Sequence, residues 1–178
     1  TAAVEVNTEA HGRETFDEVV LAVHSDQALR LLEDASEVER DVLSAVAYQP
    51  NEAVLHSDPS VMPKTRRAWS SWNYHVPAGE GRVSTVTYWM NLLQSLPEQP
   101  PFFVTMNRGA DIDSALVHRR IQYHHPVYNP ASRAAQGRWA EISGVRQTWY
   151  AGAWWGWGFH EDGVQSALRV CSAFGLEL

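Results

Sequence analysis

The sequence predicts an α+β (α/β) protein in which helices flank a mostly antiparallel sheet. Apolar residues recur at helical spacing near both ends of the chain and alternate with polar residues along its middle. One continuous apolar run, Val19 to Val23, is typical of a strand buried on both faces of a parallel sheet. At 178 residues the chain can bury one sizeable core or two interleaved sub-domains.

Residues 1–47 are expected to form a hairpin, the buried strand and two helices. Val4 to Thr8 alternates like a strand and leads to a turn at Ala10-His11-Gly12. A chain that starts inside a hairpin indicates a fragment of a longer protein.

Two short motifs mark the starts of the first two helices. Ser25 or Asp26 can cap a helix that follows the buried strand. Ser36 and Glu39 form a capping box, in which each side chain bonds the other residue's backbone amide. The sequence therefore predicts a second helix from this point.

Residues 48–128 change to an alternating pattern that predicts an antiparallel layer. One face of an early strand carries Trp72, Tyr74 and Val76, and Pro77 to Gly81 supplies the turn that follows. Ser71, Asn73 and His75 lie on the other face. The expected strands are Ala53 to His56, Trp69 to Val76, Arg82 to Trp89, Phe102 to Met106 and Ile121 to His124.

Residues 129–178 return through helix, strand and helix. Asn129 caps and Pro130 starts a helix that Gly144 ends. A strand, a loop rich in glycine and tryptophan, and a helix with apolar spacing from Val164 to Phe174 follow. Such a loop brings backbone amides up to an anionic or planar ligand, because glycine lacks a Cβ and a helix start has unpaired N–H groups. The alternative is a buried strand with an aromatic turn.

Composition excludes several classes of function. The net charge of −7 argues against nucleic acid as a partner, because the chain has no net positive field. No apolar run is long enough to span a membrane and no leader precedes the first strand, so the cytoplasm is the expected location. The single cysteine, Cys171, is expected to be a small core residue of the last helix.

Motifs for metal, phosphate and dinucleotide binding are absent. His124-His125 and His160-Glu161-Asp162 lack the spacing of two ligands on one helical face, so no metal site is expected. The serine-hydrolase elbow and the phosphate loop are missing. The stretch from Gly156 to Glu161 departs from the dinucleotide fingerprint at its third glycine. The chain alone is therefore not expected to hold a pyrophosphate.

Several strings together resemble the carboxy-terminal half of bacterial FAD-dependent oxidoreductases, the NAD/FAD-binding proteins related to flavin-containing amine oxidases. Val-His-Ser-Asp-Gln at 23–27 and Gly-Phe-His-Glu-Asp-Gly at 158–163 are the most specific. The resemblance runs nearly end to end. It covers Phe16 to Leu29, Tyr48 to Asn51, Trp69 to Tyr74, Tyr123 to Pro126 and Gly152 to Gly163.

The resemblance implies a partial FAD-binding domain, made of residues 1–47 and 129–178, and a substrate-domain sheet in residues 48–128. It implies that an absent amino-terminal half carries the Gly-x-Gly-x-x-Gly motif, and that FAD belongs to the intact parent and is not retained by this chain. It also implies a set of cofactor-binding residues: Gly152 and Ala153 beside the ribityl chain, Trp154, and Asp162, Gly163 and Val164 at the helix start facing the flavin.

Two departures limit what is carried over. Many amine oxidases have an acid where this chain has Ala153, so that contact to the ribityl hydroxyls is not expected. The only lysine, Lys64, lies well past the strand start where those enzymes place one near the flavin, so amine oxidation is not supported.

The resulting hypothesis is a flavoenzyme that moves a hydride from a substrate C–H bond to FAD. Its substrate is expected to be an apolar small molecule, and this chain, as a fragment, is expected to be inactive by itself. An aromatic set could wall the substrate cavity: Trp72, Tyr74, Trp89, Trp154, Trp155 and Trp157. Catalytic residues are unassigned among His24, His56, His75, His124 and His160. The alternative is a non-enzymatic α+β domain that binds a partner through its aromatic surface, and a fragment with bare surfaces could pair with a second copy.

Overall fold

The computed structural model describes residues 3–77, 84–97 and 99–176. It divides the chain into two compact units. The helical unit contains the residues up to Gln49 and those from Pro126 onward, and the sheet unit contains Pro50–His125. The mixture of helices and sheets confirms the α+β class.

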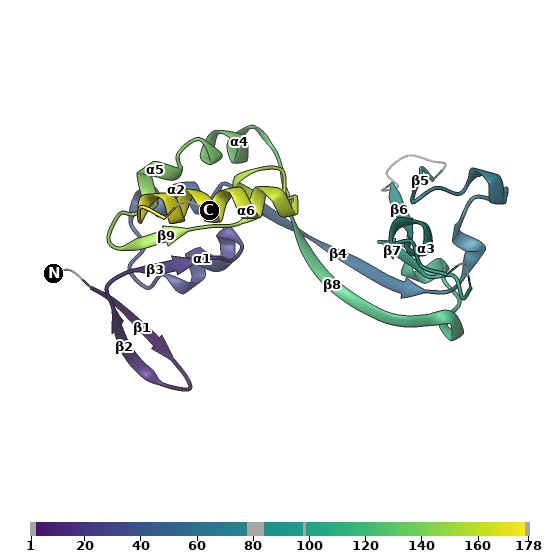
Figure 1. The fold of residues 1–178 in the computed structure, drawn as a ribbon, viewed down its shortest axis with the longest axis horizontal. Coiled ribbons are helices and arrows are strands. Elements are labelled where there is room, and N and C mark those ends of the chain that lie inside the picture. The colour runs from purple at the N-terminus through teal and green to yellow at the C-terminus, as the bar shows by residue number, and fades with distance from the viewer. Residues whose placement is uncertain (1–2, 78–83, 98, 177–178) are drawn as a thin grey trace. The chain divides into compact units, whose positions relative to one another are not determined.

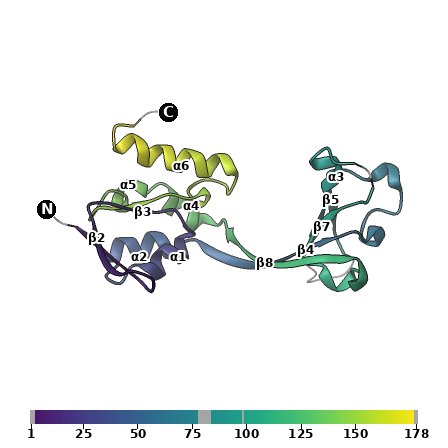
Figure 2. The same cartoon turned by 60° about the horizontal axis from the view of Figure 1, so that its bottom comes forward.

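The helical unit contains two small sheets. Strands β1 (Val4–Thr8) and β2 (Gly12–Phe16) form the expected antiparallel hairpin, seen in Figure 1. Strand β3 (Val19–Leu21) pairs in parallel with β9 (Thr148–Tyr150). Figure 2 shows α6 on one side of the β3–β9 pair and α1 and α2 on the other. The helices are α1 (Ser25–Leu31), α2 (Glu37–Ser44), α4 (Pro130–Gln136), α5 (Trp139–Ile142) and α6 (His160–Ala173).

Local capping explains where these helices begin. The capping box is confirmed, because Ser36 Oγ accepts the Glu39 amide at 3.2 Å and Glu39 Oε2 accepts the Ser36 amide at 2.7 Å. Asn129 Oδ1 accepts the Ser132 amide at 2.9 Å, which confirms the start of α4. The cap of α1 is His24, whose amide donates to the Gln27 side chain, so the prediction of Ser25 or Asp26 was one position late or more.

Two other expectations about this unit were wrong. The helix predicted up to Gly144 is split into α4 and α5. Strand β3 is not buried on both faces, because Val20 is 47% exposed. In the described part of the chain β3 pairs only with β9, so it lacks the second neighbouring strand that a central position would supply.

The core of the helical unit surrounds a buried polar pair. Tyr150 is fully buried, and its hydroxyl donates to Glu39 Oε1 at 2.7 Å. Arg146 Nη1 lies 3.4 Å from the other oxygen of Glu39. Apolar side chains from α1, α2, α4, α5, the connection after α2 and the loop after β9 pack around this pair: Ala28, Val42, Leu43, Val46, Ala135, Ile142, Trp154 and Trp155.

The sheet unit is built on a five-stranded sheet of order β5-β6-β7-β4-β8. Neighbouring strands from β5 to β4 are antiparallel, as predicted. The turn expected after Pro77 and the strand start at Arg82 lie outside the described residues. The strands are β4 (Ala47–His56), β5 (Trp72–His75), β6 (Thr85–Trp89), β7 (Phe103–Met106) and β8 (Val117–Val127). The helix α3 (Met90–Leu93) follows β6.

The alternation of β5 is confirmed, and the polar side is the covered one. Asn73 is 9% exposed, whereas Trp72 and Tyr74 are 60% and 72% exposed. The register places Asn73, Thr87, Thr105 and Val54 in one row across four strands. Short 3-10 turns and their connecting loops contribute Val61 and Ile112 to a small cluster with Val54, which covers this face.

Candidate functional site

The carboxyl ends of β3 and β9 lie side by side, as the parallel register requires. The pairing continues past the strands, because the Ala151 amide donates to the Leu21 carbonyl at 3.2 Å. The indole N–H of Trp154 then donates to the Val23 carbonyl at 3.0 Å. A Cβ on Gly152 would lie 2.5 Å from that indole nitrogen. Only glycine therefore lets the chain turn this closely against the end of β3.

A short 3-10 turn, Ala153–Trp155, connects this point to the start of α6. The Gly152 amide donates to Ser166 Oγ at 2.8 Å, and that hydroxyl donates to the Gly163 carbonyl at 2.7 Å. A Cβ on Gly163 would stand 3.8 Å from the Cβ of Ala153, so the helix packs closely on the turn. Among the described residues, the amides of Ala153 and Trp154 have no hydrogen-bond acceptor.

The start of α6 is held by Asp162. Its Oδ2 accepts the amides of Trp157 at 3.0 Å and Phe159 at 2.9 Å. Asp162 therefore caps the helix from inside its first turn, and α6 begins at His160, about one turn before the predicted start. A Cβ on Gly156 would lie 2.3 Å from Asp162 Oδ1, which shows how tightly the loop wraps the carboxylate.

The predicted cofactor-binding residues occupy different environments. Gly152, Ala153, Asp162 and Gly163 meet at the junction of the 3-10 turn and α6. Trp154 is 3% exposed and its side chain belongs to the core. Val164 is 51% exposed on α6.

Additional unpaired polar atoms lie in the same unit. The hydroxyl of Tyr128 and the indole nitrogen of Trp155 are buried and have no hydrogen-bond partner among the described residues. A Cβ on Gly158 would lie 2.8 Å from the Tyr128 hydroxyl, so Tyr128 contacts the loop before α6. Burial, together with the charge of Asp162, raises the pKa of Tyr128 to about 12, so the hydroxyl keeps its proton at neutral pH.

These donors fit part of a flavin cofactor. Two backbone amides, a phenol and an indole N–H suit a ligand that presents carbonyl and hydroxyl oxygens. The unpaired N–H groups and positive dipole at the start of α6 add a preference for negative charge. The position of Ala153 is where many amine oxidases have an acid that bonds the ribityl hydroxyls, and the methyl group of Ala153 cannot make this bond. The set therefore fits the ring side of a flavin and offers no grip for its pyrophosphate.

Sequence reasoning missed Tyr128 as part of this cluster, as well as the packing of His24 on Tyr48. The His24 and Tyr48 rings stack with centroids 4.5 Å apart, and the Ser25 amide donates to the Tyr48 hydroxyl at 2.9 Å. Both His24 and Tyr48 fall in the strings that carry the family resemblance. Tyr128 has no such signal, because its place depends on a contact with a loop 30 residues away in sequence.

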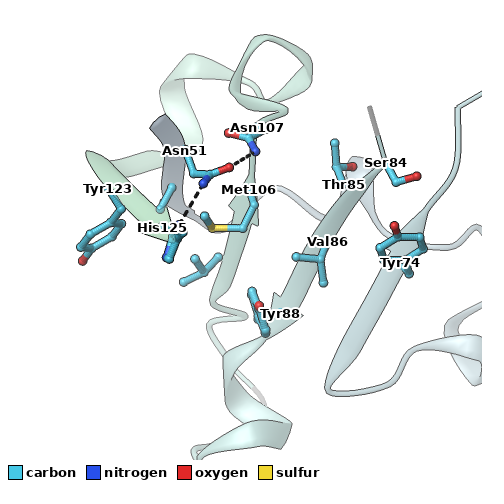
Figure 3. A pocket seen from close by; sticks show the side chains of 12 residues that line it. Asn51, Tyr74, Ser84, Thr85, Val86, Tyr88, Met106, Asn107, Tyr123 and His125 are labelled. Carbon is cyan, nitrogen blue, oxygen red and sulfur yellow. Dashed lines mark hydrogen bonds between the residues drawn. The ribbon is translucent and has the colours of Figure 1, made fainter. Parts of the chain in front are cut away.

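The open face of the sheet unit forms a hollow of about 490 Å³. Its floor is apolar, with Ala53, Val86, Val104 and Met106 from three strands. Figure 3 shows Tyr74, Tyr88 and Tyr123 around it and a polar corner where Asn107, Asn51 and His125 are linked by hydrogen bonds. A hollow with an apolar floor, a polar rim and no charged residue suits a small molecule that is uncharged and partly apolar.

The covered face of the same sheet holds His56, which is fully buried. Its Nδ1 accepts the Asp58 amide at 3.1 Å, so Nε2 carries the proton and donates to Thr105 Oγ1 at 2.8 Å. Burial lowers the pKa of His56, although the charge of Asp58 acts in the opposite direction. Among the five candidate histidines, His56 is therefore a neutral structural residue in this unit.

The aromatic set proposed for the substrate cavity is divided by the structure. Trp72 and Tyr74 lie on the open face of the sheet unit, and Trp89 lies on the covered face with Arg66 4.1 Å from its ring. Trp154 and Trp155 are buried in the helical unit and stack at 4.0 Å. Trp157 is 55% exposed beside Arg133.

Two negative findings concern the described residues. No group of three or more His, Cys, Asp or Glu side chains within residues 3–77, 84–97 and 99–176 could hold a metal ion. Over the same ranges, none of the helices has the length and apolar character needed to cross a bilayer.

Solved structures share this fold at low sequence identity. A CLA-producing fatty acid isomerase from P. acnes matches 98% of this chain and 45% of its own, with a TM-score of 0.61 and 17% identity. A candidate protoporphyrinogen oxidase from Exiguobacterium sp. 255-15 matches 99% of this chain and 45% of its own, with a TM-score of 0.57 and 16% identity. This chain spans about half of their length. No family model and no curated protein matches the sequence.

Proposed function

We propose that this chain is the carboxy-terminal part of an FAD-dependent oxidoreductase that removes a hydride from a substrate C–H bond. The observation that carries the proposal is the cluster of unpaired donors where β9 meets α6, within a fold shared with flavoprotein-type structures. Amine oxidation is not part of this proposal, because the only lysine, Lys64, lies in a loop of the sheet unit.

Bound FAD would supply the hydride acceptor for the reaction. The residues of this chain would orient it. The amides of Ala153 and Trp154 and the hydroxyl of Tyr128 would donate to flavin oxygens, and the start of α6 would favour the negative charge that develops on reduction. Asp162 would act indirectly, because it fixes the loop that precedes the helix.

The open face of the sheet unit is the proposed substrate surface. Its apolar floor and exposed aromatic rings fit an uncharged or lipid-like molecule better than a highly charged one. The two structural neighbours are named for a fatty acid and a protoporphyrinogen, which both contain large apolar parts. The substrate hydrogen that leaves as hydride and the base that accepts a proton stay unassigned.

The partner in this proposal is an amino-terminal half that carries the Gly-x-Gly-x-x-Gly motif and the pyrophosphate grip. The cytoplasm is the proposed compartment, which agrees with a chain that has a single cysteine. A homodimer of this chain would be the alternative way of covering apolar residues such as Val20 and Phe159.

The test compares this 178-residue chain with a longer product that includes the sequence encoded upstream. We expect the chain alone to be colourless and the longer protein to carry flavin in equal amount. In the longer protein, Tyr128→Phe should weaken FAD retention by about three- to tenfold, the loss of one hydrogen bond. Tyr123→Phe removes the same atom from the sheet unit and serves as the control. An upstream region without the glycine motif, or stoichiometric flavin on the short chain, would contradict the proposal.

One observation favours a second function. Three apolar side chains that alternate along one face, Trp72, Tyr74 and Val76, are each more than half exposed. Such a surface is typical of an interaction site. A non-enzymatic binding domain would use this surface without any flavin. Anaerobic addition of candidate substrates to the longer protein separates the two functions, because only the oxidoreductase would bleach.

A further inference from the structure

The polar corner of the hollow in the sheet unit includes a backbone amide that can act only as a hydrogen-bond donor. The Glu52 N–H donates to Asn107 Oδ1 at 2.9 Å. The Asn107 amide returns a bond of 2.8 Å to the Glu52 carbonyl, so the two residues are held as a pair. A backbone N–H can only donate a hydrogen bond. The Asn107 side-chain atom that faces the Glu52 N–H must therefore be the oxygen, which fixes the orientation of the Asn107 amide group.

The orientation of the Asn107 amide fixes the donor and acceptor of the next two hydrogen bonds, to Asn51 and then to His125. The Asn107 nitrogen donates to Asn51 Oδ1 at 2.6 Å, which makes that atom the oxygen of Asn51. The Asn51 nitrogen lies 3.0 Å from His125 Nδ1 and has hydrogens to donate. His125 Nδ1 must therefore accept. The relay Glu52–Asn107–Asn51–His125 thus selects the imidazole tautomer whose proton is on Nε2.

The selected tautomer makes His125 a hydrogen-bond donor at the edge of the hollow. Among the described residues, no acceptor for His125 Nε2 is present, and the ring lines the hollow beside Tyr123. The floor next to it is apolar. A ligand in the hollow would therefore meet the His125 N–H at the polar corner and the apolar floor of Ala53, Val86, Val104 and Met106 beside it.

The lack of charged residues around the hollow indicates the chemical class of the ligand more closely. None of the residues that line the hollow is Lys, Arg, Asp or Glu. Arg120, on the same strand as His125, is engaged by Glu52 Oε1 at 2.8 Å and by the Gly109 carbonyl at 3.2 Å. A carboxylate or an ammonium group would lose hydration here without a counter-charge, whereas a carbonyl oxygen would not.

We infer that the hollow binds an uncharged, mostly apolar molecule through a carbonyl oxygen that accepts a hydrogen bond from His125 Nε2, with Asn51 and Asn107 as positioning residues. The inference rests on the proposed function in one respect, since it describes the substrate surface of that enzyme. It does not require flavin to be bound.

The tautomer is tested first, on the 178-residue chain. Long-range ¹H–¹⁵N spectra of histidine-labelled protein should show His125 with a bare, accepting Nδ1 and a protonated Nε2, with the signals assigned by their loss in His125→Gln. Asn107→Gly removes the relay at a residue with φ 54°, where glycine keeps the backbone unstrained. This variant should populate both tautomers of His125. A proton on Nδ1 in the unmodified chain would overturn the inference.

Ligand chemistry is tested with three probes of equal chain length by titration calorimetry or NMR. We expect 2-octanone to bind more tightly than octanoate, and octylammonium to bind most weakly. His125→Phe should weaken 2-octanone binding by about three- to tenfold, whereas His125→Gln, which keeps an N–H donor, should lose less. His124→Gln is the matched control, because His124 is exposed and does not line the hollow.

The outcomes separate this inference from the proposed function. Equal binding of the three probes, or binding unaffected by His125→Phe, would overturn the role of His125 and leave an apolar substrate surface in place. Loss of FAD from the longer protein would contradict the proposed function and leave these measurements unchanged.

Discussion

The two units of this chain distribute their polar residues in opposite ways. The helical unit is strongly acidic, with seven basic and fifteen acidic residues, whereas the sheet unit has seven basic and six acidic ones. In the helical unit the buried polar groups pair inside an apolar core, as Glu39 and Tyr150 do. In the sheet unit the polar row is covered and the aromatic face is open.

The difference indicates what each unit is built to contact. A core that satisfies its own buried charge stabilises a fold, and the buried side-chain donors without a partner in the described helical unit are the Tyr128 hydroxyl and the Trp155 indole nitrogen. A sheet that covers Asn73 and Thr105 and exposes Trp72 and Tyr74 leaves apolar area for another molecule. The helical unit therefore offers hydrogen bonds to a polar ligand, and the sheet unit offers apolar surface.

The largest effect is expected for Glu39→Ala. Glu39 is 3% exposed and accepts from Ser36 and Tyr150, so its removal leaves buried donors unpaired and Arg146 without its inner partner. We expect a loss of about 3–5 kcal/mol in the free energy of unfolding, measured by urea denaturation. Glu37→Ala, an exposed residue of the same helix turn, should cost less than about 1 kcal/mol.

Acid should act through the same residue. Burial would raise the pKa of Glu39, but the hydrogen bonds from Ser36 and Tyr150 and the charge of Arg146 outweigh it and lower the pKa below 4.5. A carboxyl with a lowered pKa stabilises the fold above its unfolded value and loses that contribution as pH falls. The unmodified protein should lose stability below about pH 4.5 more steeply than Glu39→Ala. Equal slopes would show that Glu39 is not the ionised, hydrogen-bonded carboxylate described here.

A second comparison uses two glycines of the loop and helix after β9. Gly152→Ala places a methyl group 2.5 Å from the indole nitrogen of the buried Trp154 and should cost about 2–3 kcal/mol. Gly163→Ala meets the Ala153 methyl at 3.8 Å and the Ala153 amide nitrogen at 3.9 Å, both ordinary contacts, and lies within α6, so it should be neutral or stabilise by up to about 1 kcal/mol. Thermal unfolding of both variants checks this, and equal losses would contradict the close turn at Gly152.

A third comparison uses neighbouring residues of β5 and tests the two faces of the sheet. Asn73 accepts the Ser70 amide and donates to the Thr87 carbonyl, so Asn73→Ala should cost about 1–3 kcal/mol. Tyr74→Ala removes a larger but exposed side chain and should change stability by less than about 0.5 kcal/mol. The same variant should weaken binding of 2-octanone. If Tyr74→Ala were the more destabilising change, the open face would have been assigned to the wrong side.

Local chemistry made parts of this fold predictable. The Ser36–Glu39 box and the Asn129-Pro130 start each act within four residues, and both occur as predicted. Alternation along β5 separated Asn73 from Tyr74 correctly. The alternation did not predict which face of β5 is covered, and hydropathy alone would have placed the aromatic face inside.

The start of α6 and the His125 relay depend on contacts that sequence patterns do not show. Apolar spacing predicted the helix from Val164, but α6 starts earlier because Asp162 accepts a hydrogen bond from the Phe159 amide. The relay joins residues 51, 107 and 125 through side chains far apart in sequence. The fold class followed from periodicity, whereas the candidate site needed these long-range hydrogen bonds.

The smallest effect is expected from the titration of His56. Burial lowers its pKa from the ordinary value of 6.5, so the unfolded chain binds a proton that the folded sheet unit excludes. The contribution of His56 to stability is then complete above pH 6.5 and decreases as pH falls through the folded-state pKa.

His56→Gln should reduce this slope below pH 6.5, because the amide does not titrate, while His75→Gln, an exposed residue of β5, should keep it. Urea denaturation across this range makes the measurement. Because the slope arises on the covered face, it also reports whether that face stays closed when 2-octanone occupies the open one. An identical slope with and without the ligand is the result that two independent faces require.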